Sequence, residues 1–381
     1  MAIRKFKAIF MRELHRLWRD KDLRLILFIA PMIGLLVFYA TYSAQAIKEI
    51  PTAVVDLDRS KDSRKVMADI KKAEELQVVT SLDNVPEMEA LIKKGKVMVG
   101  IVVPENFGRD ISLGRSSRVL VVVDGSNIIY ANNASTALLT ITRTMGAQLG
   151  IKQLLAKGVH YSQAQQAYNP VAFRDEPWFN PASNYAFFLV LALALNIWQQ
   201  CCTIAASTSV IGEKELPSWK QVKASGISSL LFFGSKSVAR ITLFILTMLP
   251  VYFIGFGVLR QIPASSYLDL FLFSCLFAVA IDGMGTMMSG LAHNSVDGTR
   301  FGMIIALPSF VISGYTWPLE AMPGWLQHLA WLLPQTWFFQ GFNFLVFKDP
   351  GWAVMGKYFA ALAVIAAVCY GVAGILIEAR S

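Results

Sequence analysis

Two aspartates after a short β-rich run are the residues most suggestive of chemistry in the first half of the chain. Asp56 and Asp58 follow the predicted strand 52–55, where a carboxylate pair could act in acid–base catalysis. No histidine, cysteine or second acidic cluster nearby completes an active site, and His160 stands alone in a polar stretch. We therefore interpret Asp56, Asp58 and Asp124 as turn and cap residues, and we predict no catalytic residue.

Cysteine and glycine patterns argue against metal and nucleotide chemistry in this chain. All four cysteines fall in apolar stretches, without CxxC or Cys/His spacing, so we predict no disulfide framework and no metal site. The glycines form no GxxxxGK[ST] phosphate loop. Active transport would therefore take its energy from a partner or from an ion gradient. The cysteines are Cys201, Cys202, Cys275 and Cys369.

One acid stands inside an apolar stretch, Asp282 in FSCLFAVAIDGMGTMMSGLA. A carboxylate is costly at membrane depth, so it should face a cavity, pair with a cation or be protonated. It could contact a substrate or a proton in a transport pathway, and Asp282→Asn would then reduce transport with normal assembly. It could equally be a structural acid beside Gly283, Gly285 and Ser289, whose small side chains permit close helix approach.

Three amides are likewise polar within an apolar stretch. Asn196, Gln199 and Gln200 could, with Trp198, line an amphipathic transport pathway at a dimer seam. They could also hold helices together by hydrogen bonds. The sequence leaves both interpretations open.

Apolar helices must position these residues. The chain is 55% hydrophobic and 16% charged, whereas a typical soluble domain is about 25% charged. Its apolar stretches are long enough to cross a hydrocarbon core of about 30 Å. We predict a polytopic α-helical membrane protein with six transmembrane helices. They are residues 23–46 and then, within a five-helix region 181–381, residues 183–208, 237–259, 267–291, 299–317 and 354–377.

Basic residues predict the orientation. Residues 1–22 place apolar side chains at three- and four-residue steps among Arg and Lys, which is typical of an amphipathic helix on an anionic membrane or on a protein partner. Their charge puts the N-terminus in the cytoplasm, so six spans leave the C-terminus cytoplasmic and residues 47–180 outside. The net charge of +9 therefore reports topology and membrane lipids rather than nucleic acid. Lysines of the cytoplasmic connection 212–236 agree: Lys214, Lys220, Lys223 and Lys236.

A cleaved signal peptide is the alternative for the first apolar stretch. Ala44-Gln45-Ala46 is similar to an A-x-A cleavage site. The apolar run is longer than the usual signal-peptide core of about 7–15 residues. We therefore favour an uncleaved membrane span.

Residues 47–180 show alternating strand and helix patterns. We predict strands over 52–55, 77–80, 97–103 and 119–123, and helices over 61–75, 84–94 and 127–157, with Asn84 as a helix cap. Alternation of this kind predicts an extracytoplasmic α/β domain with a mixed sheet, inserted between the first two spans.

The stretch 309–347 is apolar but repeatedly interrupted. Pro308 directly before it, and Gly314, Pro318, Pro323 and Pro334 within it, are more breaks than a straight helix tolerates. Broken helices at membrane depth must be covered by protein or line a cavity. We predict a re-entrant external segment over 313–347, which could be a gate or only an aromatic belt. Its tryptophans are Trp317, Trp325, Trp331 and Trp337.

Motifs along the whole chain resemble one family. Val54-Val55-Asp56-Leu57-Asp58-Arg59-Ser60, Gly100-Ile101-Val102-Val103-Pro104-Glu105-Asn106-Phe107 and Asp124-Gly125-Ser126-Asn127 are similar to segments of bacterial ABC-2 type permeases. Ser313-Gly314-Tyr315-Thr316-Trp317-Pro318-Leu319-Glu320-Ala321-Met322-Pro323 resembles the family's S-G-x-x-x-P-x-x-x-M-P signature. The resembling subgroup comprises drug- and lipid-exporter-like permeases with a large external domain between the first two helices.

The resemblance implies a permease subunit of an ATP-binding cassette exporter in the bacterial inner membrane. Such a chain binds no cofactor, because ATP and Mg are held by a cytoplasmic ATPase dimer. It pairs with an identical or sister permease, and relatives often work with a periplasmic adaptor protein and an outer-membrane channel. By resemblance, the ATPase-coupling residues are Glu213, Lys214, Glu215, Trp219 and Lys220, although Pro217-Ser218 replaces the usual Gly-Thr. The external gate residues are Ser313, Gly314, Pro318, Glu320, Met322 and Pro323.

Two other functions are also compatible with the sequence. An ion-coupled secondary transporter would use Asp282, although no inverted repeat is visible. A membrane-anchored receptor or scaffold would use the external domain, and it would not need broken helices. The apolar spans with a few amides suit hydrophobic or amphipathic substrates, a drug or lipid class, without identifying a compound.

Overall fold

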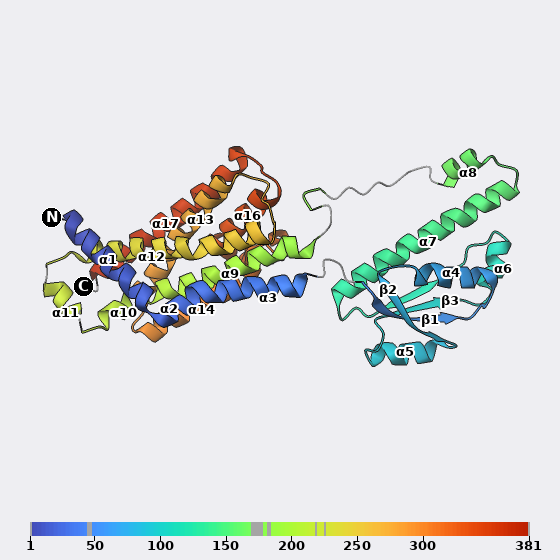
Figure 1. The fold of residues 1–381 in the computed structure, drawn as a ribbon, viewed down its shortest axis with the longest axis horizontal. Coiled ribbons are helices and arrows are strands. Elements are labelled where there is room, and N and C mark those ends of the chain that lie inside the picture. Colours follow the sequence, from blue (N-terminus) through green and yellow to red (C-terminus); the bar gives the residue numbers. More distant parts are fainter. Residues whose placement is uncertain are drawn as a thin grey trace. The chain divides into compact units, whose positions relative to one another are not determined.

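The computed structural model describes residues 2–43, 48–168, 178–180, 184–217, 219–224 and 226–379. The chain divides into two compact units, which Figure 1 shows. The membrane unit comprises Met1–Ser43 and Pro177–Ser381, and the α/β unit comprises Ala44–Glu176. The α/β unit therefore follows the first apolar helix in the sequence and precedes the second. The A-x-A segment Ala44-Gln45-Ala46 lies outside the described residues.

Six stretches of the described chain are helical, long and apolar enough to cross a membrane, which confirms the predicted number of candidate spans. The first and third contain a π-helical turn, labelled η1 and η2. The stretches are Lys21–Tyr42 (α2, Lys21–Arg24; η1, Leu25–Ile29; α3, Ala30–Tyr42), Tyr185–Lys214 (α9, Tyr185–Ser207; α10, Ile211–Lys214), Ser229–Val258 (α12, Ser229–Tyr252; η2, Phe253–Val258), Tyr267–Leu291 (α13), Ser295–Ile312 (α14) and Trp352–Ala379 (α17).

The third span begins earlier than the sequence predicts. Residues 229–236 were expected in the loop 212–236, but they form the first two turns of α12, which the Ser228 side chain caps by accepting the Leu231 N–H. When spans are predicted from hydropathy, a lysine is normally assigned to the cytoplasmic loop and not to the helix. Here Lys236 is buried and paired with carboxylates, so the helix can include it. Among the described residues between α10 and α12, the chain forms the short helix α11, Trp219–Ala224.

α13 lies at the centre of the membrane unit and packs against α9, α12 and α17. The largest apolar core of the chain surrounds it, and the rings of Phe277 and Phe338 stack with centroids 3.8 Å apart. A Cβ added at Gly285 would lie 2.3 Å from the Ala206 Cβ of α9. Small side chains therefore permit close contact between these helices, as predicted for this part of α13.

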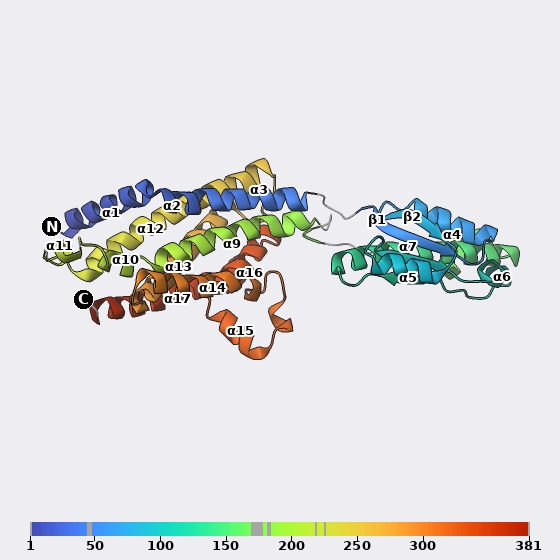
Figure 2. The ribbon, with the colours of Figure 1, turned by 90° about the horizontal axis from the view of Figure 1, so that it is seen from below.

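The N-terminal segment is a helix, α1, Ala2–Arg19, which packs along α12 (Figure 2). Ile9, Glu13 and Leu17 are buried, while most of the basic side chains are exposed. The buried stripe recurs every four residues, as expected for one helix face. A helix is therefore present in the region 1–22, and its buried stripe of Ile9, Glu13 and Leu17 contacts the rest of the membrane unit.

The interrupted stretch after α14 folds into short helices. They are η3, Leu319–Ala321; α15, Gly324–Trp331; and α16, Pro334–Phe347. α16 packs against α13 and α17, whereas α15 projects from the helix bundle in Figure 2. Proline occupies the position before or at the start of each helix, where its fixed φ is compatible with helix initiation.

The α/β unit contains a four-stranded mixed sheet with the order β2-β1-β3-β4. β1 (Ile50–Asp56) pairs in parallel with β2 (Leu76–Leu82) and β3 (Val99–Val103), and β4 (Leu120–Val123) pairs antiparallel with β3. The predicted mixed sheet is thus present. β1 and β3 are buried on both faces, which explains their continuous apolar runs.

Helices cover both faces of this sheet (Figure 1). α5 (Val85–Lys93) packs on one face. α4 (Lys61–Lys71) and the long α7 (Ile128–Ala156) pack on the other, with α6 (Phe107–Ser112) beside them. Asn84 accepts the Glu87 N–H and caps α5 as predicted. α8 (Tyr161–Tyr168) follows α7.

Candidate functional site

The aspartates of the α/β unit organise turns. Asp56 Oδ1 accepts the backbone N–H groups of Asp58 and Arg59 at 3.1 and 3.0 Å, and Asp58 Oδ2 accepts the Gly108 N–H at 3.0 Å. Asp124 accepts the Ser126 N–H at 2.9 Å, and this bond lowers the pKa of the Asp124 carboxyl. Each acid therefore does the structural work predicted for it. In the described part of the chain, no group of three His, Cys, Asp or Glu side chains could hold a metal ion.

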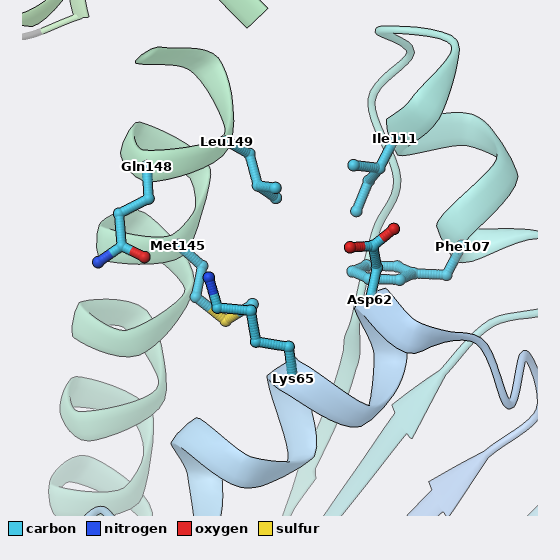
Figure 3. Close-up of a pocket in the computed structure, with 7 residues that line it drawn as sticks. All are labelled: Asp62, Lys65, Phe107, Ile111, Met145, Gln148 and Leu149. Atoms are coloured by element: carbon cyan, nitrogen blue, oxygen red, sulfur yellow. The ribbon is translucent and has the colours of Figure 1, made fainter. Parts of the chain in front are cut away.

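A small hollow lies where α4, α6 and α7 meet (Figure 3). In Figure 3 the Asp62 and Lys65 side chains of α4 stand between Phe107 and α7. The hollow has a volume of about 10 Å³, which is room for about one water molecule. This particular hollow is therefore too small for a drug or a lipid. The hollow is lined by Asp62, Lys65, Phe107, Ile111, Met145, Gln148 and Leu149.

The first polar group, the Glu213 cluster, joins α1, α10 and α12. Glu213 accepts hydrogen bonds from Arg12 at 3.0 Å, from Arg16 at 2.6 Å and from Lys236 at 2.6 Å. Lys236 also lies 3.3 Å from Glu13. Glu13, Glu213 and Lys236 are each at most 3% exposed, so they need these partners. Two acids and three cations therefore fasten α1 to the end of the second span.

The other predicted coupling residues surround this cluster. Lys214 is half-buried, and Lys220 is exposed on α11. Trp219 is buried, and its ring lies 5.8 and 5.5 Å from those of Phe232 and Phe233. The five predicted coupling residues, Glu213, Lys214, Glu215, Trp219 and Lys220, thus lie in one region. Of these, Glu215 and Lys220 are exposed. Ser218 lies outside the described residues.

Glu215 is exposed and connects the coupling segment to α14. The Ser295 hydroxyl and the Ser295 backbone N–H both donate to its carboxylate. These two bonds lower the pKa of the Glu215 carboxyl. Glu215 therefore stays charged under physiological conditions and holds α10 near the start of α14.

The second polar group, the Asp282 cluster, lies in the interior of the helix bundle. Asp282 and Arg240 form a bidentate pair with distances of 2.7 and 3.2 Å, and both side chains are buried. Tyr370 of α17 donates to Asp282 at 2.7 Å, and Thr286 accepts from Arg240 at 3.0 Å. Asp282 thus pairs with a cation, one of the three possibilities open to a carboxylate at membrane depth.

The third polar group, the amide cluster, connects α9 with α14 and α16. Gln199 donates to Asn196 at 3.0 Å and to Ser309 at 3.2 Å, and Gln335 donates to Gln199 at 3.1 Å. Gln200 also donates to Asn196, at 3.2 Å. Gln199 and Gln335 are fully buried, whereas Asn196 and Gln200 are half-buried.

Gln335 Oε1, which belongs to the amide cluster, is buried without a hydrogen-bond partner among the described residues. The same holds for Oγ1 of Thr336, the next residue of α16. Unsatisfied buried groups are costly and are often explained by water or a ligand. By contrast, Trp198 is engaged inside the core, where it donates to Thr247 at 3.0 Å.

The signature after α14 forms a tight turn. Ser313 is buried and donates to the Phe310 carbonyl at 2.6 Å, while Gln340 donates to the Ser313 carbonyl at 3.1 Å. Gly314 has φ +84°, and a Cβ there would lie 2.3 Å from Gln340 Nε2. Glycine is therefore required at this position.

The remaining predicted gate residues lie on the projecting part of this segment. Pro318 precedes η3, and Pro323 precedes α15. Met322 is buried against Leu319 and Ala330, whereas Glu320 is exposed. The structure thus places the gate residues in one compact turn region. Trp317 and Trp325 are exposed, and the rings of Trp331 and Trp337 lie 4.6 Å apart.

Sequence reasoning missed several partners of these groups. Arg240 stood inside the predicted span 237–259, and a cation at that depth was a signal that an acid must lie nearby. The positions of Tyr370 and Gln335 in the sequence do not indicate that they join a polar cluster. Glu13 lies among the basic residues of the N-terminal helix, so its burial was not predicted.

Comparison with known proteins identifies the class. Residues 21–375 match the family described as ABC-2 family transporter protein. The chain therefore belongs to the ABC-2 family of transporter proteins, and the resemblance based on its motifs is confirmed.

Three relatives cover nearly the same length. The probable multidrug ABC transporter permease YbhR of Escherichia coli (strain K12) is 24% identical over 86% of this chain and 85% of its own. The inner membrane transport permease YhhJ of the same strain is 22% identical over 95% of this chain and 97% of its own. The linearmycin resistance permease protein LnrN of Bacillus subtilis (strain 168) is 22% identical over 90% and 91%.

Proposed function

We propose that this protein is the membrane-spanning permease subunit of an ATP-driven exporter whose ATPase is a separate chain. The observation that carries the proposal is the family match over residues 21–375 in a chain without a P-loop motif. A transporter of this family that lacks the motif needs a partner to bind ATP and Mg. The permease would act as an identical or sister pair, and an adaptor and an outer-membrane channel could extend the complex.

We place the protein in the bacterial inner membrane with both termini in the cytoplasm. The basic α1 and the lysines between α9 and α12 support this orientation. The α/β unit would then lie on the extracytoplasmic side. A large external unit suits a permease that passes its substrate to further components.

The coupling role divides between buried and exposed residues. Glu213 is enclosed by cations, so it would position the segment rather than touch the ATPase. Glu215 and Lys220 are exposed and could meet the partner directly. Displacement of this segment would pull on α1 and α12 through the Glu213 cluster. This arrangement supports the transfer of motion from the ATPase to the spans.

The transport pathway would pass the amide cluster, because half-buried amides at membrane depth need protein or water rather than lipid. The unpartnered Gln335 Oε1 and Thr336 Oγ1 offer acceptors for the polar part of an amphipathic substrate. The turn at Ser313 and the projecting α15 would close this pathway on the outer side. Names such as multidrug permease and linearmycin resistance permease, given to the relatives, support a drug or lipid class of substrate.

The ion-coupled alternative loses its main support. It depended on an acid available for protons or substrate, whereas the Asp282 carboxylate forms a bidentate pair with Arg240. A receptor or scaffold would make no use of the buried amide and charge clusters. In the part of the chain that the structure describes, no feature favours either alternative over the exporter.

Purification of the tagged chain from its own cells in mild detergent, followed by mass spectrometry, tests the proposal. We expect a stoichiometric ATPase with a P-loop, and we expect Lys220→Glu to reduce its recovery. Lys348→Glu, at the exposed residue directly after α16, is the matched control and should leave recovery unchanged. A homomer without an ATPase, reproduced after cross-linking in intact cells, would contradict the exporter.

A further inference from the structure

A groove at the junction of α1 and the first span has the features of a ligand site that the transport function does not use. It measures about 320 Å³ and lies where α1 ends and the span begins. The amide cluster and the predicted gate contribute no residue to it. The groove is lined by Trp18, Lys21, Arg24, Leu25, Phe28 and Ile29.

The charged lining of the groove is entirely cationic. Lys21 and Arg24 form no ion pair in the part of the chain that the structure describes. Arg24 Nε is shielded from solvent and has no hydrogen-bond partner there. The neighbouring Asp20 is engaged elsewhere, because its carboxylate accepts the backbone N–H groups of Asp22 and Leu23. A buried donor without an acceptor is costly, so this position favours an anion.

The rest of the lining is apolar and aromatic. Trp18 and Phe28 meet edge to face with ring centroids 5.5 Å apart. Trp18, Leu25 and Ile29 are about half exposed, which leaves apolar surface beside the two cations. This exposed surface continues along α3 through Ile33, Leu36 and Val37. A ligand that uses the whole groove must therefore carry both an anionic head and an apolar chain.

The backbone is distorted at the same place. The π-helical turn η1 supplies Leu25, Phe28 and Ile29, half of the lining residues. Single π-helical turns inside α-helices often occur at functional sites. Here the turn lies directly after Arg24 and separates the cations from the regular helix α3.

We propose that this groove binds the phosphate-bearing headgroup of one anionic phospholipid, whose acyl chain lies along α3. Lys21 and the Arg24 guanidinium contact the phosphate, and Trp18 covers the glycerol region at the membrane interface. A zwitterionic lipid brings its own ammonium group beside the phosphate, so it would supply no net negative charge to the two cations. A soluble phosphate would leave the apolar side of the groove unused. The lipid is a resident ligand, independent of any transported substrate.

The test uses the full chain in mild detergent and measures its thermal unfolding midpoint during lipid titration. We expect phosphatidylglycerol to raise the midpoint, and phosphatidylcholine or inorganic phosphate to have no comparable effect. The double variant Lys21→Gln/Arg24→Gln should weaken the apparent affinity for phosphatidylglycerol about 30-fold, because each cation near a membrane surface contributes about a fivefold factor.

The control variant Arg4→Gln/Lys7→Gln removes the same two charge types from exposed positions of α1 outside the groove. We expect it to change the affinity less than about twofold. An equal loss of affinity for phosphatidylglycerol in both variants would mean that general surface charge causes the effect, and it would contradict a specific site in the groove. Equal protection by inorganic phosphate would overturn the lipid assignment.

A second measurement covers the case in which the double variant does not fold. Brominated phosphatidylglycerol should quench part of the tryptophan fluorescence of the native chain. In the Trp18→Phe variant this quenching should be lost. Trp325→Phe, an exposed tryptophan on α15, is the control and should retain it. Quenching that is unchanged by Trp18→Phe would contradict binding in this groove.

Discussion

Arg240 determines what Asp282 can do in the membrane interior. The two side chains form two hydrogen bonds with each other, and Tyr370, Thr286 and Ser237 satisfy much of their remaining hydrogen-bonding capacity. A buried ion pair of this kind contributes little net stability, but loss of one partner leaves an unpaired charge in a medium of low polarity. The acid is therefore first a structural requirement of α12, α13 and α17.

This pairing gives a prediction that differs from the expectation based on the sequence. Asp282→Asn should destabilise the chain by about 3–5 kcal/mol, because it leaves the Arg240 guanidinium buried without a counter-charge. Assembly should then decrease together with transport. The double variant Asp282→Leu/Arg240→Met should recover most of the stability. Thermal unfolding in detergent measures all three.

An exposed pair of the same type provides the control. Asp297 and Arg300 lie 3.3 Å apart, and the Arg300 side chain is 69% exposed. Asp297→Asn should cost about 0–1 kcal/mol, as is usual for surface pairs. If Asp282→Asn proved as mild as Asp297→Asn, the Arg240 pair would not be required in the fold.

At the level of secondary-structure elements, α1 connects the coupling segment to the membrane unit. Its residues Arg12 and Arg16 reach Glu213 at the end of the second span, while Lys236 reaches the same carboxylate from α12. The three elements therefore share one buried acid. A movement of α10 cannot occur without a response from α1 or a break of these bonds.

Hydrogen exchange can test this connection. Glu213→Gln should accelerate amide exchange in α1 at least about tenfold, because each hydrogen bond between charged groups contributes about 1.5–3 kcal/mol. Glu215→Gln is the matched control, since its carboxylate binds Ser295 of α14 and not α1. It should leave exchange in α1 unchanged. Equal exchange rates in α1 of both variants would mean that apolar packing alone holds this helix.

At the level of the whole molecule, the chain combines a helical membrane unit with an α/β unit that follows its first span in sequence. The proposed orientation places these parts on different sides of the membrane: the α/β unit outside, and α1 and α11 inside. Maleimide labelling can test this, because the native Cys201, Cys202 and Cys369 are at most 9% exposed. The half-buried Cys275 is replaced by alanine in the background used for labelling.

A membrane-impermeant maleimide should label Ser116→Cys, in the α/β unit, in intact spheroplasts. It should not label Lys220→Cys until the membrane is permeabilised. Both positions are exposed in their own units, so accessibility within the fold does not distinguish them. Labelling of Lys220→Cys in intact spheroplasts would reverse the orientation.

The sequence by itself determined the features that depend on composition and order along the chain. These are the six apolar stretches, the α/β pattern with its Asn84 cap, the lack of a P-loop and the signature beginning at Ser313, because each is encoded within a short local segment. The early start of α12 was missed, since a lysine looks like a loop residue until its counter-charge is known.

Only the tertiary structure decided which charges meet. Asp282 and Arg240 are separated by 42 positions in the sequence, and Glu213 and Arg12 by 201. Pairing over such distances depends on how helices pack, and no local pattern records it.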